Sequence, residues 1–75
     1  MITAYRVKYL PATINTGARF NVTRLDDKKT YRTIYNYIAT SAERHAVHEA
    51  FGEDTERLEC VGRISKTESI FAIHH

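Results

Sequence analysis

Residues 3–25 read TAYRVKYLPATINTGARFNVTRL, which is two alternating runs around a turn-forming segment. In residues 3–10 and 18–25, apolar or aromatic side chains recur at every second position, the period of a half-buried β-strand. These residues share one face: Tyr5, Val7, Tyr9, Ala18, Phe20 and Val22. The opposite face carries cations: Arg6, Lys8 and Arg19. Residues 11–17 contain the chain's only proline and several turn formers, so the stretch predicts a β-hairpin with a long loop.

Three further segments have the composition of strands. Residues 30–37 are dense in β-branched and aromatic types, residues 57–64 alternate, and residues 69–74 form a short apolar run. The sequence leaves open which face of the third strand is buried. If Ile34 points inward, the tyrosines of that strand join the cations of the hairpin on the outside.

One helix is predicted between the third and fourth strands. Thr40 and Glu43 have the spacing of a capping box, in which each side chain bonds the backbone N–H of the other residue. The helix then runs to about Phe51, and Gly52 is placed to end it. The order β-β-β-α-β-β predicts an α+β fold of two layers, an antiparallel sheet with one helix across a face.

Length and cysteine content bound the class of protein. Seventy-five residues predict one small domain, residues 1–75, with a thin core, and a homodimer is one way to gain burial. The single cysteine, Cys60, fits a reducing compartment, and its alternation with Leu58 and Ile64 predicts a buried position. No segment has the apolar length of a signal core or a membrane span, so we expect a cytoplasmic protein with no membrane partner.

Charge is divided unequally along the chain. Residues 1–37 hold all five tyrosines and seven Lys/Arg against Asp26 and Asp27, a formal charge of +5. Residues 38–75 hold four Lys/Arg against seven carboxylates, a formal charge of −3. A basic, tyrosine-rich half beside an acidic half favours a protein that works by presenting a charged aromatic surface.

Catalytic patterns are weak by comparison. His45 and His48 lie one turn apart and could hold a metal, but they fall on the side opposite the apolar stripe, so a solvated helix face is the favoured interpretation. His74 and His75 end the chain and are expected to fray. The sequence has no glycine-rich phosphate loop and no paired catalytic carboxylates. We therefore predict a protein that is not an enzyme and has no catalytic residues, metal or cofactor.

The hairpin resembles the opening of a group of short bacteriophage and mobile-element proteins, whose pattern is Lys-Tyr-Leu/Ile-Pro/Gly-x-Thr-Asn-Thr-Lys/Arg-Gly-Ser-Arg. The matching positions are Lys8, Tyr9, Leu10, Pro11, Thr13, Gly17 and Arg19. Tyr35-Asn36-Tyr37 is similar to that group's Tyr-Asp-Tyr before a helix rich in His, Arg and Ala. The likeness covers about residues 5–51 and departs from the pattern at Ile14, Asn15, Thr16 and Ala18.

This resemblance implies a phage-type accessory protein in the cytoplasm of a bacterial host. Such proteins act by stoichiometric binding to host machinery, so the expected partner is a host protein or ribonucleoprotein complex, for example a CRISPR-type defence complex. The candidate contact residues are Arg6, Lys8, Thr13, Asn15, Arg19, Arg32, Tyr35 and Tyr37. The alternative is direct nucleic-acid binding by the same basic, tyrosine-rich face.

Overall fold

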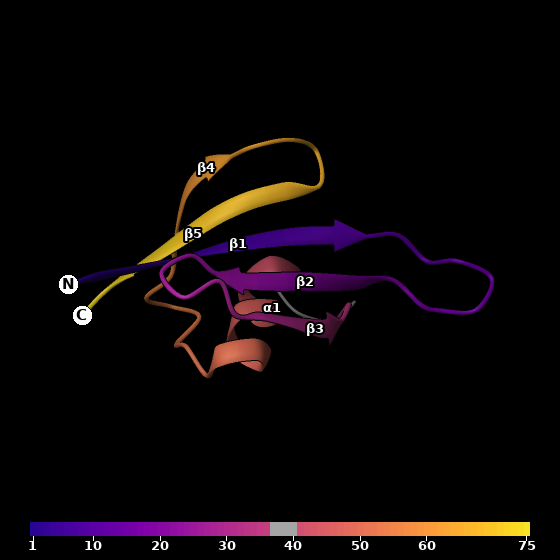
Figure 1. Ribbon diagram of the computed structural model, residues 1–75, viewed down its shortest axis with the longest axis horizontal. Helices are drawn as coiled ribbons and strands as arrows, with labels where there is room; N and C mark the ends of the chain where they lie inside the picture. The colour runs from indigo at the N-terminus through magenta and orange to yellow at the C-terminus, as the bar shows by residue number, and fades with distance from the viewer. Residues whose placement is uncertain (37–40) are drawn as a thin grey trace.

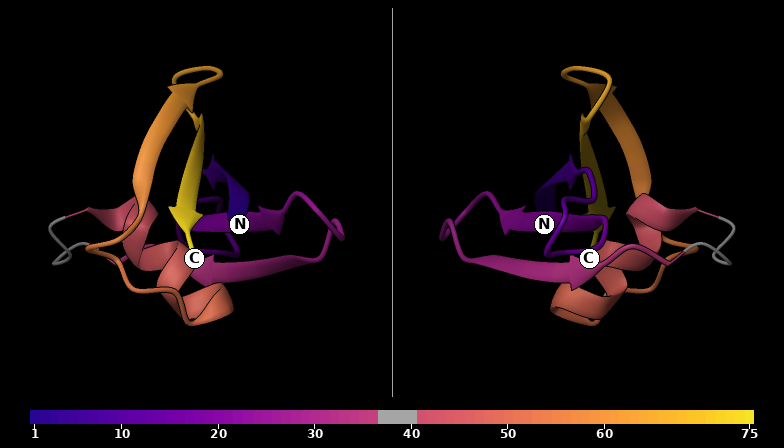
Figure 2. Two further views of the ribbon diagram at one scale, coloured as in Figure 1. Left: turned by 90° about the vertical axis from the view of Figure 1, so that its left-hand side faces the viewer. Right: turned by 90° about the vertical axis from the view of Figure 1, so that its right-hand side faces the viewer.

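The computed structural model describes residues 1–36 and 41–75. Its elements are β1 (Ile2–Leu10), β2 (Arg19–Arg24), β3 (Thr30–Ile34), α1 (Ala42–Phe51), β4 (Glu59–Arg63) and β5 (Glu68–His74). Antiparallel pairing joins the strands into one sheet with the order β3-β2-β1-β5-β4, and α1 lies against one side of it (Figures 1 and 2). The predicted α+β class and the order β-β-β-α-β-β are confirmed. No helix in the described ranges is long and apolar enough to cross a membrane.

The main core cluster lies between the sheet and α1. The alternation of the opening hairpin sets it, since Val7 pairs with Val22 and both are fully buried. The other buried members of the core are Tyr5, Phe20, Ala46, Val47, Leu58, Phe71 and Ile73. The Tyr5 hydroxyl donates to the Glu53 carboxylate at the rim of this core. Burial raises the pKa of the Tyr5 phenol, and this hydrogen bond raises it further.

The third strand turns its tyrosines toward the helix. Thr33 pairs with Phe20, so Tyr31 and Thr33 share the inner side of the sheet with it. The Tyr31 ring lies 5.1 Å from that of Phe51, while Ile34 is 85% exposed on the other side. Of the two arrangements that the sequence leaves open, the structure has the one with Tyr31 and Thr33 toward the helix and Ile34 outward. The reason is aromatic contact with Phe20 and Phe51, which depends on the pairing with β2.

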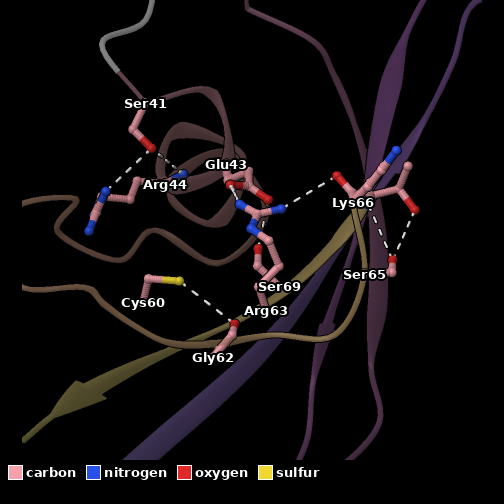
Figure 3. A network of polar contacts seen from close by, with 10 residues as sticks. Ser41, Glu43, Arg44, Cys60, Gly62, Arg63, Ser65, Lys66 and Ser69 are labelled. Atoms are coloured by element: carbon pink, nitrogen blue, oxygen red, sulfur yellow. Dashed lines mark hydrogen bonds and ion pairs between the residues drawn. The ribbon is translucent and has the colours of Figure 1, made fainter.

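The start of α1 differs from the predicted capping box. Ser41 is the N-cap, and its Oγ accepts from the Arg44 N–H at 3.4 Å, whereas Thr40 lies outside the described residues. The Glu43 carboxylate bonds elsewhere: Oε2 accepts from Ser69 Oγ at 2.6 Å and Oε1 from Arg63 Nη2 at 2.9 Å (Figure 3). Because Ser69 is fully buried on β5, it requires such a partner. Glu43 thus ties the helix to the β4–β5 hairpin.

The predicted burial of Cys60 is also wrong. Every residue of β4 is exposed, and the strand has a register shift between Cys60 and Gly62. Figure 2 shows the β4–β5 hairpin rising away from α1, so no helix covers this end of the sheet. Leu58, just before the strand, provides the buried side chain of this segment.

Gly52 ends the helix as predicted, and it allows a clean stability test. It adopts φ 74°, and its N–H donates to the His48 carbonyl at 2.7 Å. We expect Gly52→Ala to lower the free energy of unfolding by about 1 kcal/mol, because a Cβ is strained in the left-handed conformation. Gly62→Ala is the matched control, since neither glycine has an atom within 4 Å of an added Cβ and only Gly52 has a positive φ. Urea unfolding of both variants measures the difference, and an equal cost at the two positions would contradict it.

Candidate functional site

The side of the sheet that faces away from α1 collects cations from three strands, and we call it the outer face. Its charged residues on β1, β2 and β3 are Arg6, Lys8, Arg19 and Arg32. Lys8 pairs with Asn21, and Asn21 pairs with Arg32, so one row of polar side chains crosses three strands. The strand pairing produces the predicted gathering of Arg6, Lys8 and Arg19 on one face, and it also places Arg32 on that face.

The cations of β1 are only loosely neutralised. Arg6 Nε and Lys8 Nζ each lie 4.0 Å from a carboxylate oxygen of Glu68, and both side chains are about half exposed, at 52% and 50%. An exposed ion pair at this separation contributes little, because solvent screens it and two long side chains must be held in place. Both cations therefore remain able to form charged contacts with a partner.

Arg19 links the outer face to the loop of residues 11–18. Its Nη1 donates to Thr16 Oγ1 at 3.2 Å and to the Gly17 carbonyl at 3.4 Å. Within the described residues its buried Nε has no hydrogen-bond acceptor. The Thr13 N–H donates to the Thr16 carbonyl at 2.7 Å, which narrows the loop, and Figure 1 shows the loop projecting beyond the end of the sheet.

The remaining predicted contact residues do not lie together on the outer face. The Thr13 hydroxyl is bonded to Thr16 Oγ1 at 2.7 Å, and Asn15 is exposed near the tip of the loop. Tyr35 lies on the helix side, where its ring stacks on Phe20 at 5.4 Å, and so it is not on the outer face. Tyr37 lies outside the described residues.

Aliphatic residues of the outer face were missed by the sequence analysis. Leu10 and Ile70 are half buried on it, and Ile34 is largely exposed beside Arg19. The alternation of the sequence could have indicated Ile34, because residues two apart on a strand share a face and Ile34 must lie on the same side as Arg32. What the sequence lacked was the register that fixes that side.

Arg24 is a cation of the hairpin that the fold places on the inner side instead. Its guanidinium lies 5.0 Å from the centre of the Phe51 ring. Nε and Nη2 also donate to the two carboxylate oxygens of Asp27, at 3.1 and 2.6 Å. These hydrogen bonds hold the pKa of the Asp27 carboxyl well below its usual range. Arg24 therefore fastens the β2–β3 turn and is not part of the outer face.

The Arg24–Asp27 contact predicts a specific pH dependence. A carboxyl group whose pKa is depressed by folding stabilises the native state above its unfolded pKa of about 4, and this contribution is lost as pH falls toward the folded pKa. We expect Asp27→Asn to be less stable than the natural chain at pH 7 and the difference to shrink steadily below about pH 4. Thermal unfolding of both proteins from pH 7 to pH 2 measures it. A difference that is constant over this range would contradict the assignment.

The histidines have local partners. His45 Nε2 lies 3.1 Å from both Asn36 Nδ2 and Glu49 Oε1, and His48 Nδ1 lies 2.9 Å from the Glu53 carbonyl. Among residues 1–36 and 41–75, no group of three or more His, Cys, Asp or Glu side chains could hold a metal ion. The predicted fraying of the C-terminus is wrong, because His74 belongs to β5 and the His75 N–H donates to the Met1 carbonyl at 2.8 Å.

The fold and the outer face together define a small α+β domain with a one-sided core and an open, cationic sheet surface. Comparison of the chain with known protein families, curated protein sequences and solved structures finds no match. The outer face is therefore the feature of this molecule that bears on its function.

Proposed function

We propose that this protein is a phage-type accessory protein that binds, in one-to-one stoichiometry, an acidic surface of a host protein or ribonucleoprotein complex in the bacterial cytoplasm. The observation that carries the proposal is the outer face, where Arg6, Lys8, Arg19 and Arg32 converge and Glu68 is only a distant counter-ion. Cations that are exposed on an open surface steer and orient an acidic partner. The resemblance of the hairpin to short phage proteins supports a host complex, such as a CRISPR-type defence complex, as that partner.

The placement of the aromatic residues favours a protein over a nucleic acid. Single-stranded nucleic acids are bound by stacking bases on aromatic side chains beside a basic groove. The aromatic rings on β1, β2, β3 and β5 turn toward the helix side, as does that of Tyr35 just after β3: Tyr5, Tyr9, Phe20, Tyr31 and Phe71. The outer face instead mixes cations with Leu10, Ile34 and Ile70, so a partner bound there would contact apolar as well as charged side chains. The whole-chain charge of +2 is also small for a protein that binds phosphates.

A binding role also agrees with the polar residues of the fold. Two polar side chains of α1, Glu43 and His45, already have partners in the fold: Ser69, Arg63, Asn36 and Glu49. The Glu43 contacts join α1 to the β4–β5 hairpin, and the His45–Asn36 contact joins it to the segment after β3. We therefore propose no enzymatic activity.

Affinity capture from bacterial lysate tests the proposal. The tagged protein is applied with and without nuclease, and retained proteins are identified and their stoichiometry determined by mass spectrometry of the intact complex. We expect a defined protein or ribonucleoprotein partner that survives nuclease treatment and binds one copy of this chain per site. Retention that disappears when the lysate is treated with nuclease would instead support nucleic-acid binding.

A further inference from the structure

The edge strand β3 presents free backbone groups next to the outer face. The Tyr35 N–H donates to the Ala18 carbonyl at 3.1 Å, and the Arg24 N–H donates to the Lys29 carbonyl at 2.9 Å. In an antiparallel pair, hydrogen-bonded and non-hydrogen-bonded residue pairs alternate. Because these two bonds fix the alternation, the backbone groups of Tyr31 and Thr33 bond β2. The backbone N–H and C=O groups of the other three residues of β3 point away from β2: Thr30, Arg32 and Ile34.

The two edges of the sheet differ in how they are protected. The β4 edge is broken by the register shift between Cys60 and Gly62, and such bulges discourage further pairing. The β3 edge pairs regularly with β2 over all five residues, contains no proline, and has no backbone hydrogen bond on its outward side within the described residues. A straight, unprotected edge is a template for one more strand.

The side chains around this edge select the chemistry of the added strand. Arg32 points to the outer face and continues the row of Asn21 and Lys8, while Arg19 lies beside Ile34. Between the β3 edge and α1, a surface hollow is lined in part by Thr33, Ile34, His45 and Glu49, and Arg32 also borders it. A strand laid along the edge would therefore set alternate residues against cations and the others above this hollow.

A second copy of the chain fits this edge poorly. In the fullest antiparallel register, with Thr30 opposite Ile34, Arg32 would lie directly opposite its own counterpart. Like charges placed opposite each other on neighbouring strands are destabilising. A strand with a carboxylate at that position gains a favourable cross-strand pair in place of the repulsion.

We infer that the free edge of β3 binds an extended acidic segment of the partner as a sixth strand of the sheet. Its carboxylates, at alternate positions, face Arg32 and Arg19, and its intervening apolar side chains lie above the hollow beside α1. The backbone groups of Thr30, Arg32 and Ile34 supply the hydrogen bonds. This inference rests on the proposed function and adds to it the conformation and charge pattern of the segment that is bound.

A synthetic peptide tests the inference directly. The probe is a blocked seven-residue peptide that alternates glutamate with valine, and its controls are the same peptide with lysine for glutamate and an acidic peptide of equal charge interrupted by proline. We expect the alternating acidic probe to bind at least tenfold more tightly than either control. In NMR spectra its binding should shift and protect the amides of Thr30, Arg32 and Ile34.

Ile34→Pro separates strand addition from simple charge attraction. It deletes one outward N–H and leaves every cation in place, and proline is tolerated on an edge whose N–H is not used by the sheet. Ile34→Ala is the matched control, because it removes the same apolar side chain and keeps the N–H. We expect the probe to lose at least tenfold in affinity for Ile34→Pro relative to Ile34→Ala. Should the proline variant fail to fold, N-methylation of the probe on alternate residues provides the same test, since only one of the two methylated sets should bind.

The outcomes distinguish this inference from the proposed function. Strand addition would be overturned if the probe bound the two Ile34 variants with equal affinity, or if the protein bound the probe no more tightly than the control peptides. It would also be overturned if the free protein formed a dimer that dissociates in the Ile34→Pro variant. The captured lysate partner provides a further test. If Ile34→Pro still captures this partner but a variant with reversed charges on the outer face does not, strand addition is overturned and the proposed function stands.

Discussion

Replacing both Lys8 and Arg32 by glutamate is expected to weaken binding of the captured partner by roughly 100-fold or more while the fold is retained. The two side chains lie in one row across β1, β2 and β3, on either side of Asn21. Reversing both turns two attractive contacts with an acidic surface into repulsive ones. Neither residue belongs to the core, so the fold should be retained. Because a glutamate at position 8 lies opposite Glu68 on β5, we expect a modest decrease in the thermal unfolding temperature.

A control with the same change in charge is available on the same molecule. Lys29 and Lys66 are exposed, and both lie outside the strands of the sheet, Lys29 in the β2–β3 turn and Lys66 in the β4–β5 turn. Replacing both by glutamate lowers the net charge equally, so long-range attraction falls to a similar extent in both variants. Titration of each variant against the purified partner measures the affinities. Equal losses would mean that net charge alone drives binding and that the outer face has no specific role.

Arg19 is unsuitable for this comparison, although the sequence singles it out. Its guanidinium bonds Thr16 and the Gly17 carbonyl, so any replacement alters the projecting loop as well as the charge of the outer face. A loss of binding in an Arg19 variant would therefore have two explanations.

The strand alternation of the opening hairpin was sufficient to predict the core and the location of the cations. Val7 and Val22 are buried, and Arg6 and Lys8 lie on the opposite side, because a period of two leaves only one way to bury both apolar sets. The end of the helix at Gly52 and its buried face, with Ala46 and Val47, followed from equally local signals. These features needed no knowledge of how distant segments pair.

The errors arose where tertiary pairing decides the outcome. The third strand has apolar or aromatic residues on both faces, and only its register with β2 brings Tyr31 to Phe51 and leaves Ile34 exposed. Cys60 alternates as a buried residue would, yet a bulge and a position at the edge of the sheet expose it. Glu43 has the spacing of a capping box, but the buried hydroxyl of Ser69 and the guanidinium of Arg63 bind its carboxylate. None of these contacts is encoded within a few residues of the side chain concerned.

Phe71→Ala is expected to have the largest effect on stability, costing about 3–5 kcal/mol of the free energy of unfolding. Phe71 is 1% exposed on the central part of β5, and the Arg44 guanidinium lies 5.3 Å from the centre of its ring. Small domains have total stabilities of about 5–15 kcal/mol, so this variant should be largely unfolded or show a strongly lowered unfolding midpoint. Circular dichroism during urea unfolding measures the change.

Ile70→Ala is the matched comparison, because Ile70 precedes Phe71 on the same strand and points to the outer face. It is only half buried and leaves no enclosed cavity when shortened, so we expect a cost of about 1 kcal/mol or less. If the main core lies on the helix side, Phe71→Ala must lower the free energy of unfolding more than Ile70→Ala does. If the two substitutions cost the same, the outer face would be packed as tightly as the inner one. The cations of β1, β2 and β3 would then have no open surface on which to meet a partner.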